Sequence, residues 1–225
     1  MRRAALAVPL FLLAAASMAR ATPAATRFGL TLHVAADDGG VAVADRPWLE
    51  AWVREASAYF APADLAFAIE EVRHLGPSSH VLRTNRDRHA LARHFVERRI
   101  NVFVVARIED PSPSRATVRA AALRGHSLSG RLGGAHVRTR GHDPGTYVIV
   151  LAGSHPTTLA HELGHFFGAG HHPDEENIMS YGRERHRFDE RQLAAFRHFT
   201  RRYVRRRSLR PLPDPAPSAI PSGGR

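Results

Sequence analysis

The sequence HELGHFFGAGHH, residues 161–172, places four histidines and one glutamate within an apolar, glycine-containing stretch. Its first part has a helical pattern, on which His161 and His165 are one turn apart and share a face. Gly168 falls where this helix should end, because glycine tolerates the left-handed conformation that turns a chain out of a helix. Such a turn allows His171 to return toward the first two histidines.

Three neutral imidazoles so arranged can bind one Zn²⁺ at ~2.0–2.1 Å and leave a fourth position open for water, which is typical of catalytic zinc sites. Glu162 is next to the first histidine but offset around the helix, so it is placed to contact the water instead of the metal. A surface helix with solvated histidines is the alternative. That alternative does not account for the glycine turn or for the apolar residues Leu163, Phe166 and Phe167.

The spacing H-E-x-x-H-x-x-G-x-x-H is followed by NIMSYG, residues 177–182. Together these motifs resemble the metzincins, a family of zinc-dependent endopeptidases. The resemblance implies that Met179 forms a Met-turn beneath the metal. It also implies that Tyr181 is similar to the tyrosine that astacins, serralysins and pappalysins place near zinc, where its phenol ligates the metal at rest and later donates to the oxyanion. An ordinary core methionine and a buried core tyrosine are the alternatives.

The resemblance implies an α/β (α+β) fold: a mostly parallel twisted sheet, a backing helix, the active-site helix, the Met-turn and a C-terminal helix. It also implies a protein or peptide substrate and one catalytic Zn²⁺ held by His161, His165 and His171, with Glu162 and Tyr181 as catalytic residues. His172 departs from the astacin pattern, which has glutamate after the third histidine.

The periodicity of the sequence supports this architecture. Alternating or continuous apolar runs predict strands at 28–34, 65–69, 102–106, 134–139 and 147–152. The runs at 102–106 and 147–152 are apolar throughout, as in strands buried on both faces. Since strands and helices alternate, we expect a mostly parallel sheet, with 134–139 as the candidate edge strand that binds substrate.

Helices are expected at four places. One follows Asp45 as cap, with Pro47 in its first turn. A surface helix is expected at 87–98. The active-site helix is expected to have Ser154 as cap and Pro156 in its first turn. The last helix should begin with a capping box, formed by Asp189 and Gln192, and bury one face made of Leu193, Phe196, Tyr203 and Val204.

The ends of the chain differ from the predicted catalytic domain, 22–207. Residues 1–21 have a positive start, an apolar run and a small-x-small site, which predicts a signal peptide cleaved before Thr22. We therefore expect a secreted or periplasmic protein without a stable membrane span; an uncleaved anchor is the alternative. Residues 208–225 contain five prolines, which predicts a disordered tail.

All 32 basic residues are arginine, and the net charge of +11 falls to +8 without residues 1–21. The chain has no cysteine, so disulfides and thiol chemistry are excluded. A second hypothesis is therefore a secreted basic protein that binds nucleic acid or anionic polymer and holds zinc structurally. No nucleic-acid-binding motif accompanies the six arginines of 201–210, so we do not expect a nucleic-acid partner. A zinc-binding pseudo-protease is a third hypothesis, against which the intact Glu162 argues.

Two groups of residues remain open. Arg183, Arg185 and Arg187 follow the predicted Met-turn and either line the substrate cleft or belong to a solvated loop. The other histidines are expected to be surface or local hydrogen-bonding groups, among them His33, His126, His136 and His142.

Overall fold

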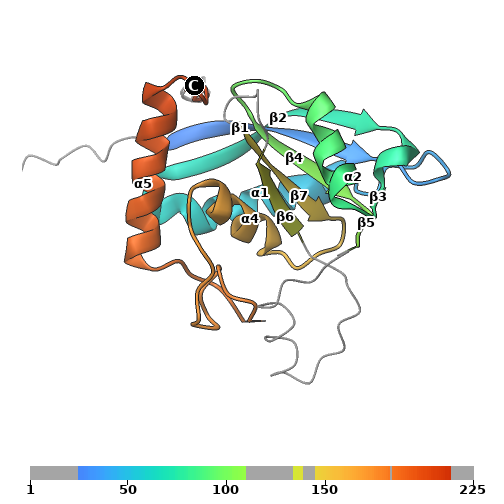
Figure 1. The fold of residues 1–225 in the computed structure, drawn as a ribbon. Helices are drawn as coiled ribbons and strands as arrows, with labels where there is room; N and C mark the ends of the chain where they lie inside the picture. The colour runs from blue at the N-terminus through green and yellow to red at the C-terminus, as the bar shows by residue number, and fades with distance from the viewer. Residues whose placement is uncertain (1–24, 110–133, 139–144, 183, 214–225) are drawn as a thin grey trace, which may run out of the picture.

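The computed structural model describes residues 25–109, 134–138, 145–182 and 184–213 (Figure 1). Its centre is a five-stranded sheet with the order β2-β1-β4-β7-β6. The strands are β1 (Thr26–Ala35), β2 (Leu65–Leu75), β4 (Ile100–Val105), β6 (Gly134–Arg138) and β7 (Thr146–Leu151). All neighbours are parallel except β6, which pairs antiparallel with β7 and ends the sheet. The predicted α/β class with a mostly parallel sheet is confirmed.

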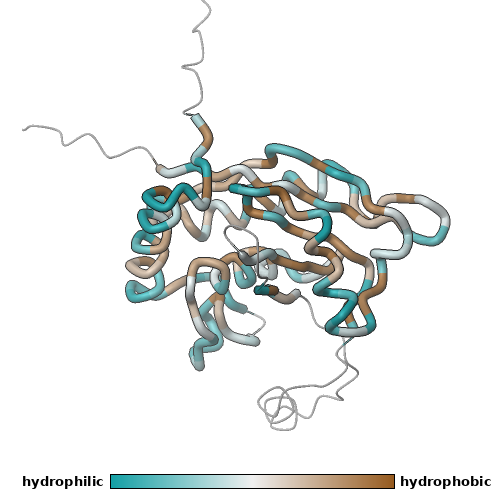
Figure 2. The backbone as a smooth tube through the Cα atoms, turned by 45° about the horizontal axis from the view of Figure 1, so that its top comes forward, coloured by the Kyte–Doolittle hydropathy of each residue, from teal (hydrophilic) through white to brown (hydrophobic). Residues whose placement is uncertain are grey.

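The central strands are buried on both faces, which is why their sequences are continuously apolar. Along β4, Val102 and Val104 belong to one hydrophobic cluster, while Phe103 and Val105 belong to a second cluster on the other face. Figure 2 shows the resulting hydrophobic backbone segments in the middle of the molecule, with hydrophilic segments around them. The second face is covered by a two-stranded sheet of β3 (Val81–Leu82) and β5 (Arg107–Ile108) and by Leu91 and Phe95, which follow α2 (Asn85–Ala90).

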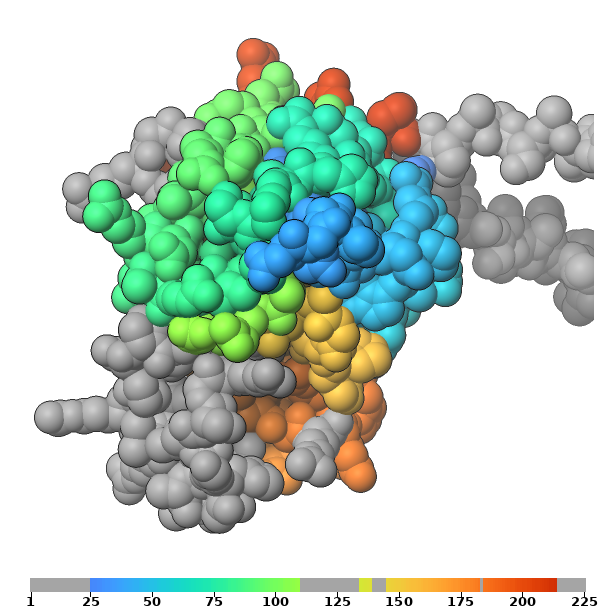
Figure 3. All heavy atoms as spheres, turned by 90° about the vertical axis from the view of Figure 1, so that its right-hand side faces the viewer, coloured from blue at the N-terminus to red at the C-terminus, as the bar shows by residue number. Residues whose placement is uncertain are grey.

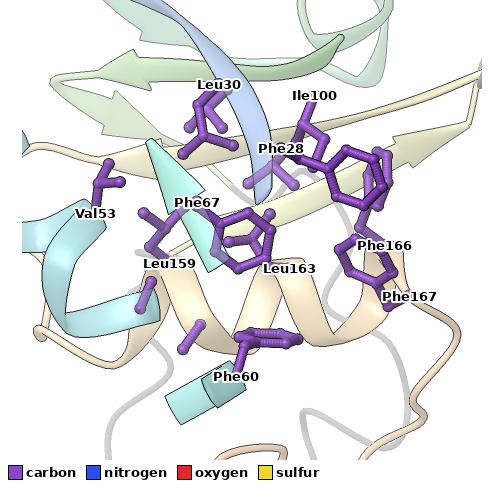
Figure 4. Close-up of a cluster of buried hydrophobic side chains, with 14 of the residues drawn as sticks. Phe28, Leu30, Val53, Phe60, Phe67, Ile100, Leu159, Leu163, Phe166 and Phe167 are labelled. Atoms are coloured by element: carbon purple, nitrogen blue, oxygen red, sulfur yellow. The ribbon is translucent and has the colours of Figure 1, made fainter. Parts of the chain in front are cut away.

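Two helices cover the first face of the sheet. Helix α1 (Arg46–Phe60) begins as predicted, because Asp45 Oδ1 accepts a hydrogen bond from the backbone of Trp48 at 2.9 Å. Helix α4 (Thr158–Phe166) packs between α1 and strands β6 and β7. Figure 4 shows Leu159 and Leu163 of α4 in the cluster that α1 and the sheet share. This packing fixes the position of the helix that carries His161, Glu162 and His165.

Helix α5 (Glu190–Arg205) stands at one end of the strands (Figure 1). The predicted capping box is present, since Asp189 accepts from the backbone of Gln192 and the Gln192 side chain bonds back to Asp189. Phe196 is fully buried against aromatic rings of α1 and of the segment after α4. Val204, which was expected to share a face with Phe196, is exposed and lies in the last turn of α5.

Two predicted helix starts are wrong. The surface helix begins at Asn85 instead of residue 87, because Thr84 and Asp87 form a capping box. The helical segment ends before Phe95, whose backbone is extended. Ser154 does not cap α4: its backbone closes a turn onto Leu151, and the helix begins four residues later, at Thr158. Figure 3 shows the part of the chain that runs from β7 toward α4 (gold) between the segments before residue 110 (green) and the segment that follows α4 (orange).

The prediction of a disordered tail from residue 208 is wrong for its first six residues. Ser208 and Leu209 are buried, and Leu209 belongs to the core cluster. Pro211 forms a β-bridge with Phe28, and the backbone of Leu212 donates to Arg27 at 2.7 Å. Prolines suit such an edge position, where a missing N–H costs nothing. Residues 214–225 and the predicted signal peptide, 1–21, lie outside the described residues.

Among the residues described above, none of the helices combines the length and hydrophobicity needed to span a membrane.

Candidate metal centre

Helix α4 and the turn after it bring the three predicted zinc ligands together. Gly168 has a φ of +89°, and its backbone N–H donates to His165 at 3.0 Å, which ends the helix as predicted. The chain then returns through His171. One ring nitrogen from each of His161, His165 and His171 lies within 4.8 Å of the other two. The three imidazoles share a cavity of about 440 Å³ with Glu162 and Tyr181.

Backbone carbonyls orient the first two imidazoles. His161 Nδ1 donates to the carbonyl of Ile178 and His165 Nδ1 donates to the carbonyl of Ala169, both at 2.8 Å. Since each Nδ1 carries the proton, each Nε2 presents a lone pair, as metal-bound histidines require. His165 Nε2 and His171 Nε2 are 3.1 Å apart, close to the roughly 3.3–3.4 Å that tetrahedral ligands at ~2.0–2.1 Å would show. The donor set therefore fits a zinc ion.

Burial keeps these imidazoles neutral. It lowers the pKa of His161 to about 3 and that of His165 to about 4, and it also lowers the pKa of His171. The remaining histidines add a smaller effect in the same direction for the first two. Because a metal binds the neutral ring, these histidines are in the ligating form at neutral pH.

Glu162 is only 5% exposed and lies against the backbone of Gly134 in β6. Burial raises the pKa of its carboxyl to about 8, and the nearby Arg185 opposes this shift. Without a further cation the carboxyl is mostly protonated at neutral pH. Its ligand atom is near those of His165 and His136, so the acid is inside the same cluster of donors.

Met179, which the sequence predicts to form a Met-turn beneath the metal, packs against helix α4 at Gly164. It is fully buried, and a Cβ on Gly164 of α4 would clash with its sulfur, so only glycine allows this approach. The turn is held by Asn177, whose side chain accepts from the Met179 backbone at 2.8 Å and bonds Gln192 of α5 through both amide groups. This turn is thus attached to α5 as well as to His161.

Tyr181 follows the Met-turn and reaches the third histidine. Its hydroxyl lies 3.0 Å from His171 Nε2, and the residue is 50% exposed. Partial burial raises the pKa of the phenol, so it stays protonated at neutral pH. The structure therefore brings together all the predicted site residues: His161, Glu162, His165, His171, Met179 and Tyr181.

His136 and Arg185 are among the further residues that line the cavity. His136 of β6 was expected to be a surface or local hydrogen-bonding group, but its ring stacks on that of His165 with centroids 4.7 Å apart. Arg185 donates to the Thr157 hydroxyl at 2.7 Å and to the Ser180 carbonyl at 2.9 Å. The periodicity of β6 places His136 on one face but does not reveal what that face meets. His126 and His142 lie outside the described residues.

The arginines after the Met-turn have different positions. Arg185 lines the cavity, whereas Arg187 points to solvent and pairs with Asp174 and Glu176. Arg183 lies outside the described residues. Of the two alternatives, lining the cleft applies to Arg185 and a solvated loop applies to Arg187.

The fold is one that solved metalloproteinases share. Metalloproteinase-II from Bacteroides fragilis matches with a TM-score of 0.53 and 13% identity, over 78% of this chain and 53% of that chain. Archaemetzincin from Methanopyrus kandleri matches with a TM-score of 0.51 and 17% identity, over 78% of this chain and 96% of that chain. This chain thus spans about half the length of the first. No protein-family profile and no curated protein match the sequence.

The matches define a metallopeptidase fold, and the histidine cluster lies in it as a possible zinc site. Identities this low speak for the fold alone. The closer likeness to astacins, serralysins and pappalysins, which depends on Tyr181, stays a prediction.

Proposed function

We propose that this chain is an extracytoplasmic zinc-dependent endopeptidase in which His161, His165 and His171 hold one Zn²⁺. The observation that carries the proposal is the convergence of the three imidazoles, two of them oriented by backbone carbonyls, beside a buried carboxyl. A solvated surface helix would have neither the carbonyl partners nor the burial. The metallopeptidase fold supports the same conclusion.

When bound, Zn²⁺ would polarise the scissile carbonyl, lower the pKa of a water to about 7 and favour the charged form of a neighbouring carboxylate. Glu162 takes the proton of the attacking water and delivers it to the leaving amine, which is general base and then general acid catalysis. Tyr181 donates a hydrogen bond to the oxygen that gains negative charge. Its hydroxyl is already inside the cavity, beside His171.

The substrate binds along strand β6. This strand is at the end of the sheet formed by the described strands, and Gly134, Ala135 and His136 line the cavity. An extended peptide can add to such an edge through backbone hydrogen bonds, which places a peptide bond beside Glu162. Residues 1–21 direct the chain out of the cytoplasm; N-terminal sequencing of the mature protein, beginning near Thr22, tests this part.

The test of catalysis compares the full mature chain with Glu162→Gln, Tyr181→Phe and the control Glu190→Gln. Glu190 is exposed on α5, far along the chain from the motif. Hydrolysis of a quenched peptide library should be abolished by a chelator and restored by Zn²⁺. Glu162→Gln should keep one zinc and lose roughly 10²–10⁴ in kcat/KM. Tyr181→Phe should lose less, because it removes only one hydrogen bond, and Glu190→Gln should match the wild type.

If zinc-loaded Glu162→Gln cleaved as fast as the wild type, the assigned mechanism would be wrong. If the wild type bound one zinc and cleaved no peptide, a structural zinc in a polymer-binding protein or a pseudo-protease would be favoured. Loss of zinc from Glu162→Gln would leave proton transfer to be measured with Glu162→Ala or Glu162→Asp.

A further inference from the structure

A second hollow of about 410 Å³ lies on the other side of His165 from the catalytic cavity. The two hollows share His136 and His165 in their linings, so they are continuous along β6. The second hollow is walled by the end of β6, the turn at Gly168 and the last turns of α5. Three of its lining residues carry a positive charge: Arg138, Arg202 and Arg206.

These three arginines, here called the arginine groove, are not neutralised by the described part of the protein. Arg202 of α5 and Arg206, which caps the C-terminal end of α5, are one turn apart and both line the hollow, as does Arg138 of β6. No described carboxylate forms an ion pair with any of them, whereas surface arginines such as Arg46 and Arg187 have acidic partners. Like charges at this helical spacing repel each other, and a bound anion relieves the repulsion.

Part of the groove is held in place before anything binds. The guanidinium of Arg202 lies 5.8 Å from the centroid of the Phe199 ring, a cation–π contact that restrains it. Ser208, which is buried, also lines the hollow. The packing of residues 208–213 on β1 fixes this part of the wall. The wall of the groove and Arg202 are therefore formed features of the fold, while Arg138 and Arg206 reach it from exposed positions.

Strand β6 connects the groove to the reacting bond. Gly134, Ala135 and His136 line the catalytic cavity, and His136 and Arg138 line the groove. An extended peptide that pairs with β6 therefore passes from one hollow into the other within about two residues, or roughly 7 Å. Antiparallel pairing is the more stable arrangement, and it places the N-terminal part of the peptide at the groove, because β6 runs from cavity to groove.

We propose that the arginine groove binds acidic side chains on the N-terminal side of the scissile bond. The substrate class is then peptides or proteins with aspartate or glutamate a few residues before the cleaved bond. This inference rests on the proposed peptidase function. Two guanidinium groups on one helix face and a third on the strand suit carboxylates, which accept their hydrogen bonds in pairs.

The cleavage experiment uses three quenched peptides with a common apolar core. One has three glutamates on the N-terminal side, one has them on the C-terminal side, and one has glutamines at all these positions. The variants are Arg202→Gln/Arg206→Gln and the matched control Arg201→Gln/Arg205→Gln, which removes the same charge from another face of α5. In the wild type, N-terminal glutamates should raise kcat/KM about three- to tenfold over glutamines at low salt.

The groove variant should lose this preference, measured as the ratio of kcat/KM for the N-terminal glutamate peptide to that for the glutamine peptide. The control variant should keep the ratio and the wild-type rate on the glutamine peptide. Equal losses in the two variants would show that only overall charge matters and would overturn the proposal. A preference for C-terminal glutamates would also overturn it, because the groove would then lie on the wrong side of the bond.

A binding experiment separates this inference from the peptidase proposal. Fluorescence anisotropy of the labelled N-terminal glutamate peptide is measured with zinc-loaded Glu162→Gln protein, alone and combined with each arginine pair. Three- to tenfold weaker binding with the groove pair, about as estimated for two exposed charges, supports the groove even if the wild type hydrolyses nothing. Tighter binding of a twelve-residue oligothymidylate through the same two arginines would assign the groove to nucleic acid and overturn the proposal.

Discussion

His33 and His161 are both buried histidines of one domain, 0% and 5% exposed, and burial lowers the pKa of both, to about 4 and about 3. Their surroundings differ. His33 of β1 stacks on Phe103 and bonds the Asn101 side chain at 2.9 Å. His161 bonds a backbone carbonyl and faces two further imidazoles across a cavity. Burial and a low pKa are therefore shared by both regions, and the converging lone pairs distinguish the metal centre.

The partner of His33 also serves the backbone. Asn101 accepts from the N–H of Val96 at 2.9 Å and donates to its carbonyl at 2.8 Å, so the histidine is joined through Asn101 to the backbone that precedes β4. In the metal centre, by contrast, ring nitrogens of the three histidines point toward a common position. One region uses a histidine to support packing, and the other uses three to hold a ligand.

The largest contrast is expected in zinc affinity. His171→Ala removes a ligand, so its affinity for zinc should fall by more than the roughly 10–100-fold that outer-sphere changes cause. His172→Ala and His33→Phe should retain zinc near the wild-type level, since neither residue contributes to the cluster. Elemental analysis and a competition titration with a chromogenic chelator measure this. Unchanged zinc in His171→Ala would show that the ligand set is wrong.

A substitution beside His33 should instead change the stability of the fold. Asn101→Ala leaves the buried groups of His33 and Val96 without their partner, so the free energy of unfolding should fall by about 2–4 kcal/mol. The zinc content of the folded variant should not change. Urea unfolding with and without zinc measures both quantities, and Asn85→Ala, at an exposed site on α2, is the control. A variant that lost zinc as well would mean that the two regions are coupled.

A further effect, spread over about two pH units, is a dependence of stability on pH. The pKa of His33 is about 4 in the folded protein and near 6.5 in the unfolded chain, so protonation favours unfolding. Its contribution is present above pH 6.5 and is lost as the pH falls toward 4, by up to about 1.4 kcal/mol per pH unit. In the presence of a chelator, the free energy of unfolding of His33→Phe should depend less steeply on pH between pH 4 and 6.5. The slope should be smaller by up to the equivalent of one bound proton. Parallel curves for the two proteins would contradict this assignment.

Much of the site followed from local sequence. The helical spacing of His161 and His165 and the glycine that ends α4 depend on the backbone geometry of a few consecutive residues. The same holds for the capping box of Asp189 and Gln192. The alternation in residues 134–139 placed β6, and its lack of a second apolar face fits the edge position that the structure shows. Ser154 misled because a turn that follows a strand uses the same residue types as a helix cap.

The sequence by itself determined the mostly parallel sheet, the three candidate zinc ligands with Glu162, and the helix that carries the first two, because these depend on periodicity and local geometry. Only the tertiary structure decided which distant groups meet. It placed His136 on His165, attached the Met-turn to α5, packed Leu209 into the core and brought Arg138 beside the arginines of α5. The physical reason is that these contacts join segments far apart in the chain, and neither spacing nor composition encodes which surfaces will face each other.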